Sequence, residues 1–124
     1  MARILVAEDE ESLCAMCARA LVGAGHEVKT ASDGSEALDV LKREDGRFDL
    51  LLTDIRMPIM DGIALALAAA RDFPELVILL MTGYADQRER AQGLDALIHD
   101  VIAKPFTLAV LRAAVDEALA VKAG

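Results

Sequence analysis

The stretch LLLTDIRMPIMDG, residues 50–62, decides the fold. It begins with apolar and β-branched residues, which are typical of a buried strand, and this strand runs directly into Asp54. Met57–Gly62 contains a proline and a glycine and is therefore predicted to be a loop. The alanine-rich residues 62–72 then predict a helix. This order places a carboxylate at the carboxyl end of a buried strand.

The same alternation of strand and helix continues on both sides of this stretch. Four more short segments predict strands, of which Val28–Ala31 is the weakest, and a segment with helical features follows each of them. The other predicted strands are Ile4–Ala7, Val28–Ala31, Val77–Met81 and residues 99–103. The five predicted helices begin near residues 12, 35, 62, 86 and 107, and the polar helix that begins near residue 86 is predicted to end near residue 96. Because the strands are continuous apolar runs, they predict an α/β fold with a parallel sheet covered on both faces.

The last predicted helix illustrates how the sheet is covered. Thr107 is a typical N-cap residue, because its hydroxyl can accept a hydrogen bond from a free backbone N–H. The apolar residues that follow recur at helical spacing, which predicts that one face of this helix is buried. The residues predicted to be buried are Leu108, Leu111, Val115 and Leu119.

The composition argues against several classes of protein. The chain has 124 residues, with 13 Lys and Arg against 21 Asp and Glu, and a net charge of −8. An acidic chain does not attract phosphate backbones, so we expect no nucleic-acid partner. The apolar runs Ile63–Ala70 and Leu76–Met81 are too short to span a membrane, and the N-terminus does not resemble a signal peptide. We therefore expect a cytoplasmic protein with one domain, residues 1–124, and no output domain. Cys14 and Cys17 are predicted to pack in the core.

Polar residues stand at the carboxyl ends of four predicted strands. Glu8 and Asp9 follow the first strand, and Asp54 ends the third. Thr82 follows the fourth strand, and Lys104 follows the fifth. In open α/β sheets, ligands bind outside the carboxyl ends of the strands, so these five side chains are predicted to share one pocket.

Three carboxylates in one pocket repel one another unless they share a cation. Oxygen ligands suit a hard divalent ion, and Mg²⁺ is the predicted occupant. An aspartate beside Mg²⁺ can act as a nucleophile and form an acyl phosphate. Lys104 and Thr82 would then hold phosphoryl oxygens, with Asp54 as the acceptor. Each residue taken alone is also an ordinary helix-start or turn residue, but their joint occurrence at four strand ends favours a site.

Four motifs resemble the signatures of the receiver domain of two-component response regulators. They are ILVAEDE at residues 4–10, LLTDIRMPIMDG at residues 51–62, MTG at residues 81–83 and AKPF at residues 103–106. The motifs follow the order and spacing of the family and extend over essentially the whole chain. The resemblance implies a doubly wound, flavodoxin-like sheet of order 2-1-3-4-5 with five helices. Among receivers, the sequence resembles single-domain regulators of the CpdR type.

The resemblance also implies roles for individual residues. Asp54 is expected to accept a phosphoryl group from a histidine kinase or a histidine phosphotransfer protein. Asp9 is expected to bind Mg²⁺ directly, Glu8 through water, and Arg56 through its backbone carbonyl, with Asp54 completing the metal site. Tyr84 and Arg56 lie where the family controls the access of water to the acyl phosphate, so both are expected to affect its lifetime.

The resemblance assigns the signalling step to the last two strands. Lys104 is expected to pair with the phosphoryl group, and Thr82 is expected to move and hydrogen-bond it. The Lys104–Pro105 peptide is typically cis in the family. The chain departs from the family at Val101, where many receivers carry a tyrosine or phenylalanine that rotates with the threonine. Phosphorylation is therefore expected to be reported through Thr82, loop rearrangement and surface packing.

The expected output is a contact with an unidentified downstream protein. The predicted surface comprises the fourth helix, the fifth strand and the last helix, because Thr82 and Lys104 lie at that edge. The protein is not expected to be an enzyme beyond its own phosphorylation and autodephosphorylation. One alternative is a Mg²⁺-dependent phosphohydrolase similar to haloacid-dehalogenase-like enzymes, although these use Asp-x-Asp where this chain has Asp54-Ile55-Arg56. Another is an adaptor that acts without phosphorylation.

Overall fold

The computed structural model describes the backbone of residues 1–123 and the side chains of these residues except 85–87 and 123. Five strands and five helices alternate along this part of the chain. The strands are β1 (Arg3–Ala7), β2 (Glu27–Ala31), β3 (Leu50–Asp54), β4 (Val77–Thr82) and β5 (Asp100–Ala103). The helices are α1 (Glu11–Gly23), α2 (Gly34–Arg43), α3 (Gly62–Asp72), α4 (Ala85–Ala91) and α5 (Leu108–Ala123), and a 3-10 turn, η1 (Gln92–Leu94), follows α4. None of these helices has the length and apolar character needed to cross a membrane.

All five strands are parallel and lie in the order β2-β1-β3-β4-β5, which confirms the expected topology. Every residue of β3, at the centre of the sheet, is buried, which explains its continuous apolar sequence. The chain leaves β1 towards one edge of the sheet and later continues from β3 towards the other edge. The carboxyl ends of β1 and β3 therefore flank the topological switch point, where ligands bind in this class of sheet.

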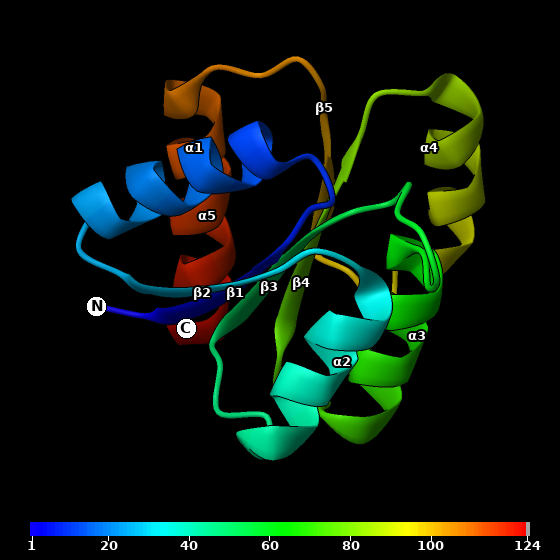
Figure 1. Cartoon of the computed structure of the whole chain (residues 1–124), viewed down its shortest axis with the longest axis horizontal. Helices are drawn as coiled ribbons and strands as arrows, with labels where there is room; N and C mark the ends of the chain where they lie inside the picture. Colours follow the sequence, from blue (N-terminus) through cyan, green and yellow to red (C-terminus); the bar gives the residue numbers. More distant parts are fainter. Residues whose placement is uncertain (124) are drawn as a thin grey trace.

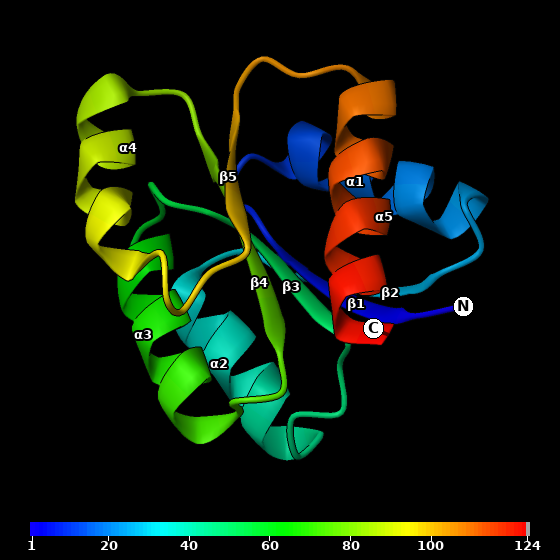
Figure 2. The same cartoon turned by 180° about the vertical axis from the view of Figure 1, so that it is seen from behind.

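The helices form a layer on each face of the sheet. α1 and α5 cover one face, whereas α2, α3 and α4 cover the other (Figure 1, and from behind in Figure 2). Successive strand residues point to opposite faces, so Leu5 packs under α2 and α3 while Val6 packs under α1 and α5. Cys14 and Cys17 are free thiols on the buried face of α1 and pack in the core, as predicted.

Three of the helices begin at a side-chain cap. The carboxylates of Asp33 and Asp61 each accept a hydrogen bond of 2.8 Å from the backbone N–H three residues later, at the starts of α2 and α3. The hydroxyl of Thr107 accepts a similar bond of 3.1 Å at the start of α5, as predicted. These caps satisfy N–H groups that have no partner within the helix.

Two expectations about the second half of the chain are wrong. The helix predicted for residues 86–96 ends at Ala91 and continues as the 3-10 turn η1, which contains Gly93, a poor helix former. Leu108, which is predicted to be buried, is 39% exposed, because it is the first residue of α5, where the helix has just begun. Leu111 and Val115, further along the helix, are fully buried as predicted.

Candidate functional site

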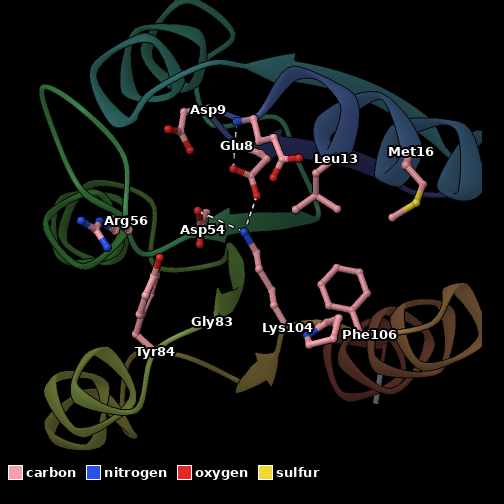
Figure 3. A pocket seen from close by; sticks show the side chains of 12 residues that line it. Glu8, Asp9, Leu13, Met16, Asp54, Arg56, Gly83, Tyr84, Lys104 and Phe106 are labelled. Carbon is pink, nitrogen blue, oxygen red and sulfur yellow. Dashed lines mark hydrogen bonds and ion pairs between the residues drawn. The ribbon is translucent and has the colours of Figure 1, made fainter.

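Four of the five predicted polar residues gather at the edge of the sheet formed by the carboxyl ends of β1, β3 and β5 (Figure 3), whereas Thr82 does not line the pocket there. Glu8 and Asp9 directly follow β1, and Asp54 is the last residue of β3. Lys104 follows β5. These four side chains line a pocket of about 670 Å³. The structure therefore brings together groups that are up to 96 positions apart in the sequence.

Lys104 links the carboxylates from β1 and β3. Its ammonium nitrogen lies 2.6 Å from Oε1 of Glu8 and 3.2 Å from Oδ2 of Asp54. The other carboxylate oxygen of Glu8, Oε2, accepts a hydrogen bond of 3.1 Å from the backbone N–H of Glu10. The Lys104–Pro105 peptide is cis, as the resemblance implies. The ion pairs hold the Lys104 ammonium between Glu8 and Asp54 (Figure 3).

Burial controls the protonation of this cluster. It raises the pKa of Glu8 to about 7, although the hydrogen bond from Lys104 acts in the opposite direction. Burial also raises the pKa of Asp54, against the effect of the nearby Lys104 charge. For Lys104, burial lowers the pKa, but the hydrogen bond to Glu8 and the charge of Asp54 outweigh it and raise the pKa overall. One ammonium therefore does not fully compensate the buried carboxylates.

The carboxylates have the composition of a site for a hard divalent cation. Glu8, Asp9 and Asp54 each offer an oxygen, and these oxygens lie within 4.8 Å of one another. Glu8 and Asp54 are buried, whereas Asp9 is exposed at the pocket mouth. An oxygen-only set with excess negative charge is what Mg²⁺ prefers, and the exposed side leaves room for the waters that this ion retains. The residues present therefore fit Mg²⁺.

The loop between β3 and α3, residues 55–61, folds tightly against the end of β3. The N–H of Gly62 donates a hydrogen bond of 2.7 Å to the carbonyl of Ile55. A Cβ at Gly62 would overlap the backbone carbonyl of Asp54, so this close approach requires glycine. The tight loop brings Arg56 to the pocket wall. The role of its backbone carbonyl as a metal ligand stays a prediction.

An arginine and a tyrosine stack beside the carboxylates. The guanidinium carbon of Arg56 lies 4.9 Å from the centre of the Tyr84 ring, a cation–π contact that joins the loop after β3 to the loop after β4 (Figure 3). Both residues line the pocket, and Tyr84 is half exposed. The sequence placed both residues near the site but gave no indication that they stack on each other.

Thr82 is buried at the end of β4 and bonds to the loop that leads into α4. Its hydroxyl donates a hydrogen bond of 3.1 Å to the carbonyl of Tyr84 and accepts one of 3.2 Å from the N–H of the same residue. Tyr84 is the residue immediately before α4. At the other end of this helix, Arg90 forms an ion pair of 3.0 Å with Asp61. Thr82 thus connects the site to the start of α4.

One side of the pocket is apolar, which the sequence analysis did not anticipate. Leu13 and Met16 of α1 face Phe106 across the pocket, beside Lys104 (Figure 3). Leu13 is half-buried and packs at the margin of the core. The sequence contains an indication of this apolar side. Leu13 and Met16 lie three residues apart and therefore on the same face of the helix that follows the acidic loop.

Comparisons with known proteins give the same interpretation as the geometry. The family model described as the response regulator receiver domain matches residues 4–116. Response regulator MprA of Mycobacterium avium is 37% identical over 111 residues, which cover 90% of this chain and 48% of that protein. The transcriptional regulatory protein PrrA of Mycobacterium tuberculosis is 34% identical over 117 residues, which cover 94% and 49%. The chain thus spans about half the length of these relatives.

Solved structures of similar size have the same fold. A CheY-like receiver domain protein from Methanospirillum hungatei has a TM-score of 0.88 and 30% identity, and the match covers 98% of this chain and 96% of that one. The response regulator TrrA of Thermotoga maritima, solved in complex with Mg²⁺ and BeF, has a TM-score of 0.82 and 30% identity, with coverage of 95% and 99%. With the fold, the strand-end carboxylates and the family model in agreement, the chain belongs to the receiver domain family of two-component response regulators.

Proposed function

We propose that this receiver is a phosphorylation-dependent switch in which Asp54 accepts a phosphoryl group from a histidine kinase or a histidine phosphotransfer protein. The observation that carries the proposal is the position of the Asp54 carboxylate. It lies at the base of the pocket, 3.2 Å from the ammonium of Lys104 and beside two further carboxylates. A nucleophile, a fixed positive charge and an oxygen-rich cation site are the parts that phosphoryl transfer needs.

The transfer step requires no additional reactant. A carboxylate oxygen of Asp54 forms a bond to phosphorus while the bond from phosphorus to the donor histidine nitrogen breaks, and the electron pair stays on that nitrogen. Lys104 is held close to Asp54 before the reaction, so its charge can stabilise a phosphoryl oxygen without reorganisation. Hydrolysis by one water returns the carboxylate and releases phosphate, which is the autodephosphorylation expected of such a domain.

Glu8, Asp9, Asp54 and the backbone carbonyl of Arg56 are the proposed ligands of Mg²⁺. When bound, the ion supplies positive charge that offsets the charge on the phosphoryl oxygens. The chain's own contribution is to hold the acidic groups in place. Glu8 is fixed by Lys104 and by the N–H of Glu10, so this carboxylate is oriented before the metal arrives.

The stacked Arg56 and Tyr84 are proposed to limit the access of water to the acyl phosphate. Both line the mouth of the pocket from opposite loops, and their contact places an aromatic ring beside the reacting carboxylate. Removing the ring widens the path for water and shortens the lifetime of the phosphorylated form. This assignment develops the expectation from the sequence that both residues affect that lifetime.

The phosphorylated state is proposed to be transmitted through Thr82 to α4. When the Thr82 hydroxyl turns towards a phosphoryl oxygen, it gives up its two hydrogen bonds to Tyr84, directly before α4. The proposed contact surface for a downstream protein is therefore α4, β5 and α5. Because the kinase uses ATP, we place the reaction in the cytoplasm. The absence of an output domain stays a prediction.

Intact-protein mass spectrometry tests the assignment of Asp54. With Mg²⁺ and acetyl phosphate, the protein is expected to gain one labile phosphoryl group. The variant Asp54→Asn is expected to gain none, whereas the control Asp116→Asn, at an exposed position of α5, is expected to behave as wild type. A label that persists in Asp54→Asn would refute the proposal. Turnover of small phosphate esters would favour the phosphohydrolase alternative instead.

A further inference from the structure

A short turn outside the pocket connects the two loops that carry the proposed metal ligands. This turn, residues 31–34, links β2 to α2 and is called here the β2–α2 turn. The carbonyl of Ala31 accepts a hydrogen bond of 3.0 Å from the N–H of Glu8, at the end of β1. The N–H of Gly34 donates one of 3.1 Å to the carbonyl of Met60, in the loop between β3 and α3. In Figure 1 the start of α2 lies beside this loop.

The β2–α2 turn is internally fixed. Asp33 accepts a hydrogen bond of 2.8 Å from the N–H of Glu36, which caps α2. The carboxylate of Glu36 in turn accepts bonds from the hydroxyl and the N–H of Ser32, at 2.7 and 3.2 Å. Such reciprocal bonds hold the chain direction at a helix start. The turn is therefore rigid enough to transmit a displacement from one loop to the other.

Gly34 sets how closely α2 and the β3–α3 loop approach. A Cβ at Gly34 would overlap the carbonyl carbon, the carbonyl oxygen and the Cβ of Met60. Two of these atoms belong to the backbone and cannot swing aside as the end of a flexible side chain can. Alanine is a better helix former than glycine, so intrinsic propensity alone does not favour glycine here. The requirement for glycine comes from the approach of the loop.

The rest of the β3–α3 loop is fixed at its start. The N–H of Ile55 donates a hydrogen bond of 3.0 Å to the carbonyl of Met81 in β4, and the carbonyl of Ile55 accepts from Gly62 at 2.7 Å. Because the loop is held at Ile55, a displacement at Met60 has to be absorbed by the residues between them. Arg56, whose carbonyl is a proposed metal ligand, is the first of these.

We infer that Gly34 is a positioning residue for metal binding, and that the β2–α2 turn sets the spacing between the Glu8–Asp9 pair and the loop of Arg56. The inference rests on the proposed function, in which these groups hold Mg²⁺. It assigns a role in the site to a residue that touches neither the pocket nor the phosphoryl group. Gly34 acts through the backbone of Met60.

Isothermal titration of Mg²⁺ into the purified chain measures this role directly. Gly34→Ala is expected to weaken Mg²⁺ binding about tenfold, which is typical when a group that orients a metal ligand is disturbed. The matched control is Gly93→Ala, because a Cβ there meets nothing within 4 Å. Gly93→Ala is expected to bind Mg²⁺ as wild type does. Amide exchange of the β3–α3 loop is expected to increase in Gly34→Ala and not in Gly93→Ala.

A second variant keeps the test decisive if Gly34→Ala does not fold. Asp33→Ala removes the side-chain cap that fixes the β2–α2 turn, at a half-buried position. This variant is expected to weaken Mg²⁺ binding while its far-UV circular dichroism stays that of wild type. If Gly34→Ala folds and binds Mg²⁺ with wild-type affinity, the inference is overturned. If Gly34→Ala does not fold, wild-type Mg²⁺ affinity in Asp33→Ala overturns it. If the wild-type chain itself does not bind Mg²⁺, or if Asp9→Asn leaves binding unchanged, the proposed function fails instead.

Discussion

At the scale of single residues, the protonation of the site is governed by buried carboxyl groups whose negative charge is not fully compensated. Lys104 contacts both Glu8 and Asp54, yet burial remains the largest influence on the pKa of each carboxyl group and raises both values. A buried carboxylate that must ionise lowers the stability of the folded state. The metal-free receiver therefore carries an electrostatic cost that a bound cation removes.

This cost makes the stability of the metal-free protein depend on pH. The pKa of Glu8 is about 7 in the folded protein, above its ordinary value of 4.5, so the folded state holds a proton that the unfolded chain releases. The resulting stabilisation is fully present below pH 4.5 and is lost as the pH rises through about 7. Urea denaturation in EDTA is therefore expected to give a lower free energy of unfolding at about pH 8 than at about pH 5.

The variant Glu8→Gln is expected to reduce this pH dependence, because it removes one of the two carboxyl groups whose pKa burial raises. Glu11→Gln, an exposed acid in the first turn of α1, is the matched control and is expected to keep the wild-type slope. Equal slopes in wild type and Glu8→Gln would contradict the explanation.

Backbone strain occurs at one residue of the β3–α3 loop. Ile59 has a φ of 70°, which branched side chains rarely adopt, and it is 83% exposed, so it gains little from burial. Ile59→Asn is expected to raise the free energy of unfolding by about 1 kcal/mol, because asparagine tolerates this conformation. Val110→Asn, at a half-exposed position of α5 with ordinary helical backbone, is expected to show no such gain. Thermal denaturation in EDTA distinguishes these outcomes. If Ile59→Asn is no more stable than wild type, the backbone at Ile59 is not strained.

The residues at the strand ends were predictable, whereas the contacts between loop residues were not. Glu8, Asp54 and Lys104 follow from the rule that parallel strands present their carboxyl ends at one edge. The stacking of Arg56 on Tyr84 depends on side-chain conformations in two separate loops, and no local pattern encodes it. The clash that requires Gly34 is likewise between segments distant in sequence.

At the scale of elements, α4 is the shortest of the five described helices. It comprises seven residues, its first residue follows Tyr84, and an exposed ion pair between Arg90 and Asp61 ties its last turn to α3. Exposed ion pairs contribute roughly 0–1 kcal/mol. The polar sequence of this segment predicts a longer helix, but the structure replaces its second half by η1 around Gly93. A helix of seven residues gains little stability from its own backbone hydrogen bonds and is suited to adopt two arrangements.

Hydrogen exchange tests whether Thr82 controls α4. Beryllofluoride, which mimics the aspartyl phosphate when bound to Asp54, is expected to change amide exchange in α4 of the wild-type protein with Mg²⁺. In Thr82→Ala this change is expected to be lost, because the hydroxyl that leaves the backbone of Tyr84 is absent. Thr107→Ala removes a hydroxyl that caps α5 and is expected to retain the response in α4. The same response in Thr82→Ala as in wild type would contradict the proposed coupling.

At the scale of the whole molecule, the layered fold follows from the apolar runs, but the strand order does not. Continuous apolar strands separated by helices predict a parallel sheet covered on both faces, which is what the structure has. Placing β1 between β2 and β3 required the resemblance to receivers, because several orders satisfy the same pattern. In that order β1 and β3 are neighbours at the topological switch point, which brings Glu8 and Asp54 together. The strand order therefore determines the position of the site.

The net charge of −8 also has a local explanation at this scale. Glu8, Asp9 and Asp54 contribute three of the 21 acidic residues, and the fold gathers them at one edge of the sheet. The sequence indicates an acidic protein, whereas the sheet topology shows that part of this charge is gathered in one cluster, which is the proposed cation site. The charge therefore supports a function as well as solubility.

Asp54 is proposed to accept a phosphoryl group in a reaction that needs Mg²⁺, and the decisive experiment is to locate that group on the chain. The chain is treated with acetyl phosphate and reduced with borohydride, which converts an aspartyl phosphate to homoserine, and the peptides are sequenced by tandem mass spectrometry. We predict homoserine at position 54 when Mg²⁺ is present and an unmodified aspartate there when EDTA replaces it. Homoserine at another aspartate, such as Asp9, or an unmodified Asp54 in the presence of Mg²⁺, would contradict the account.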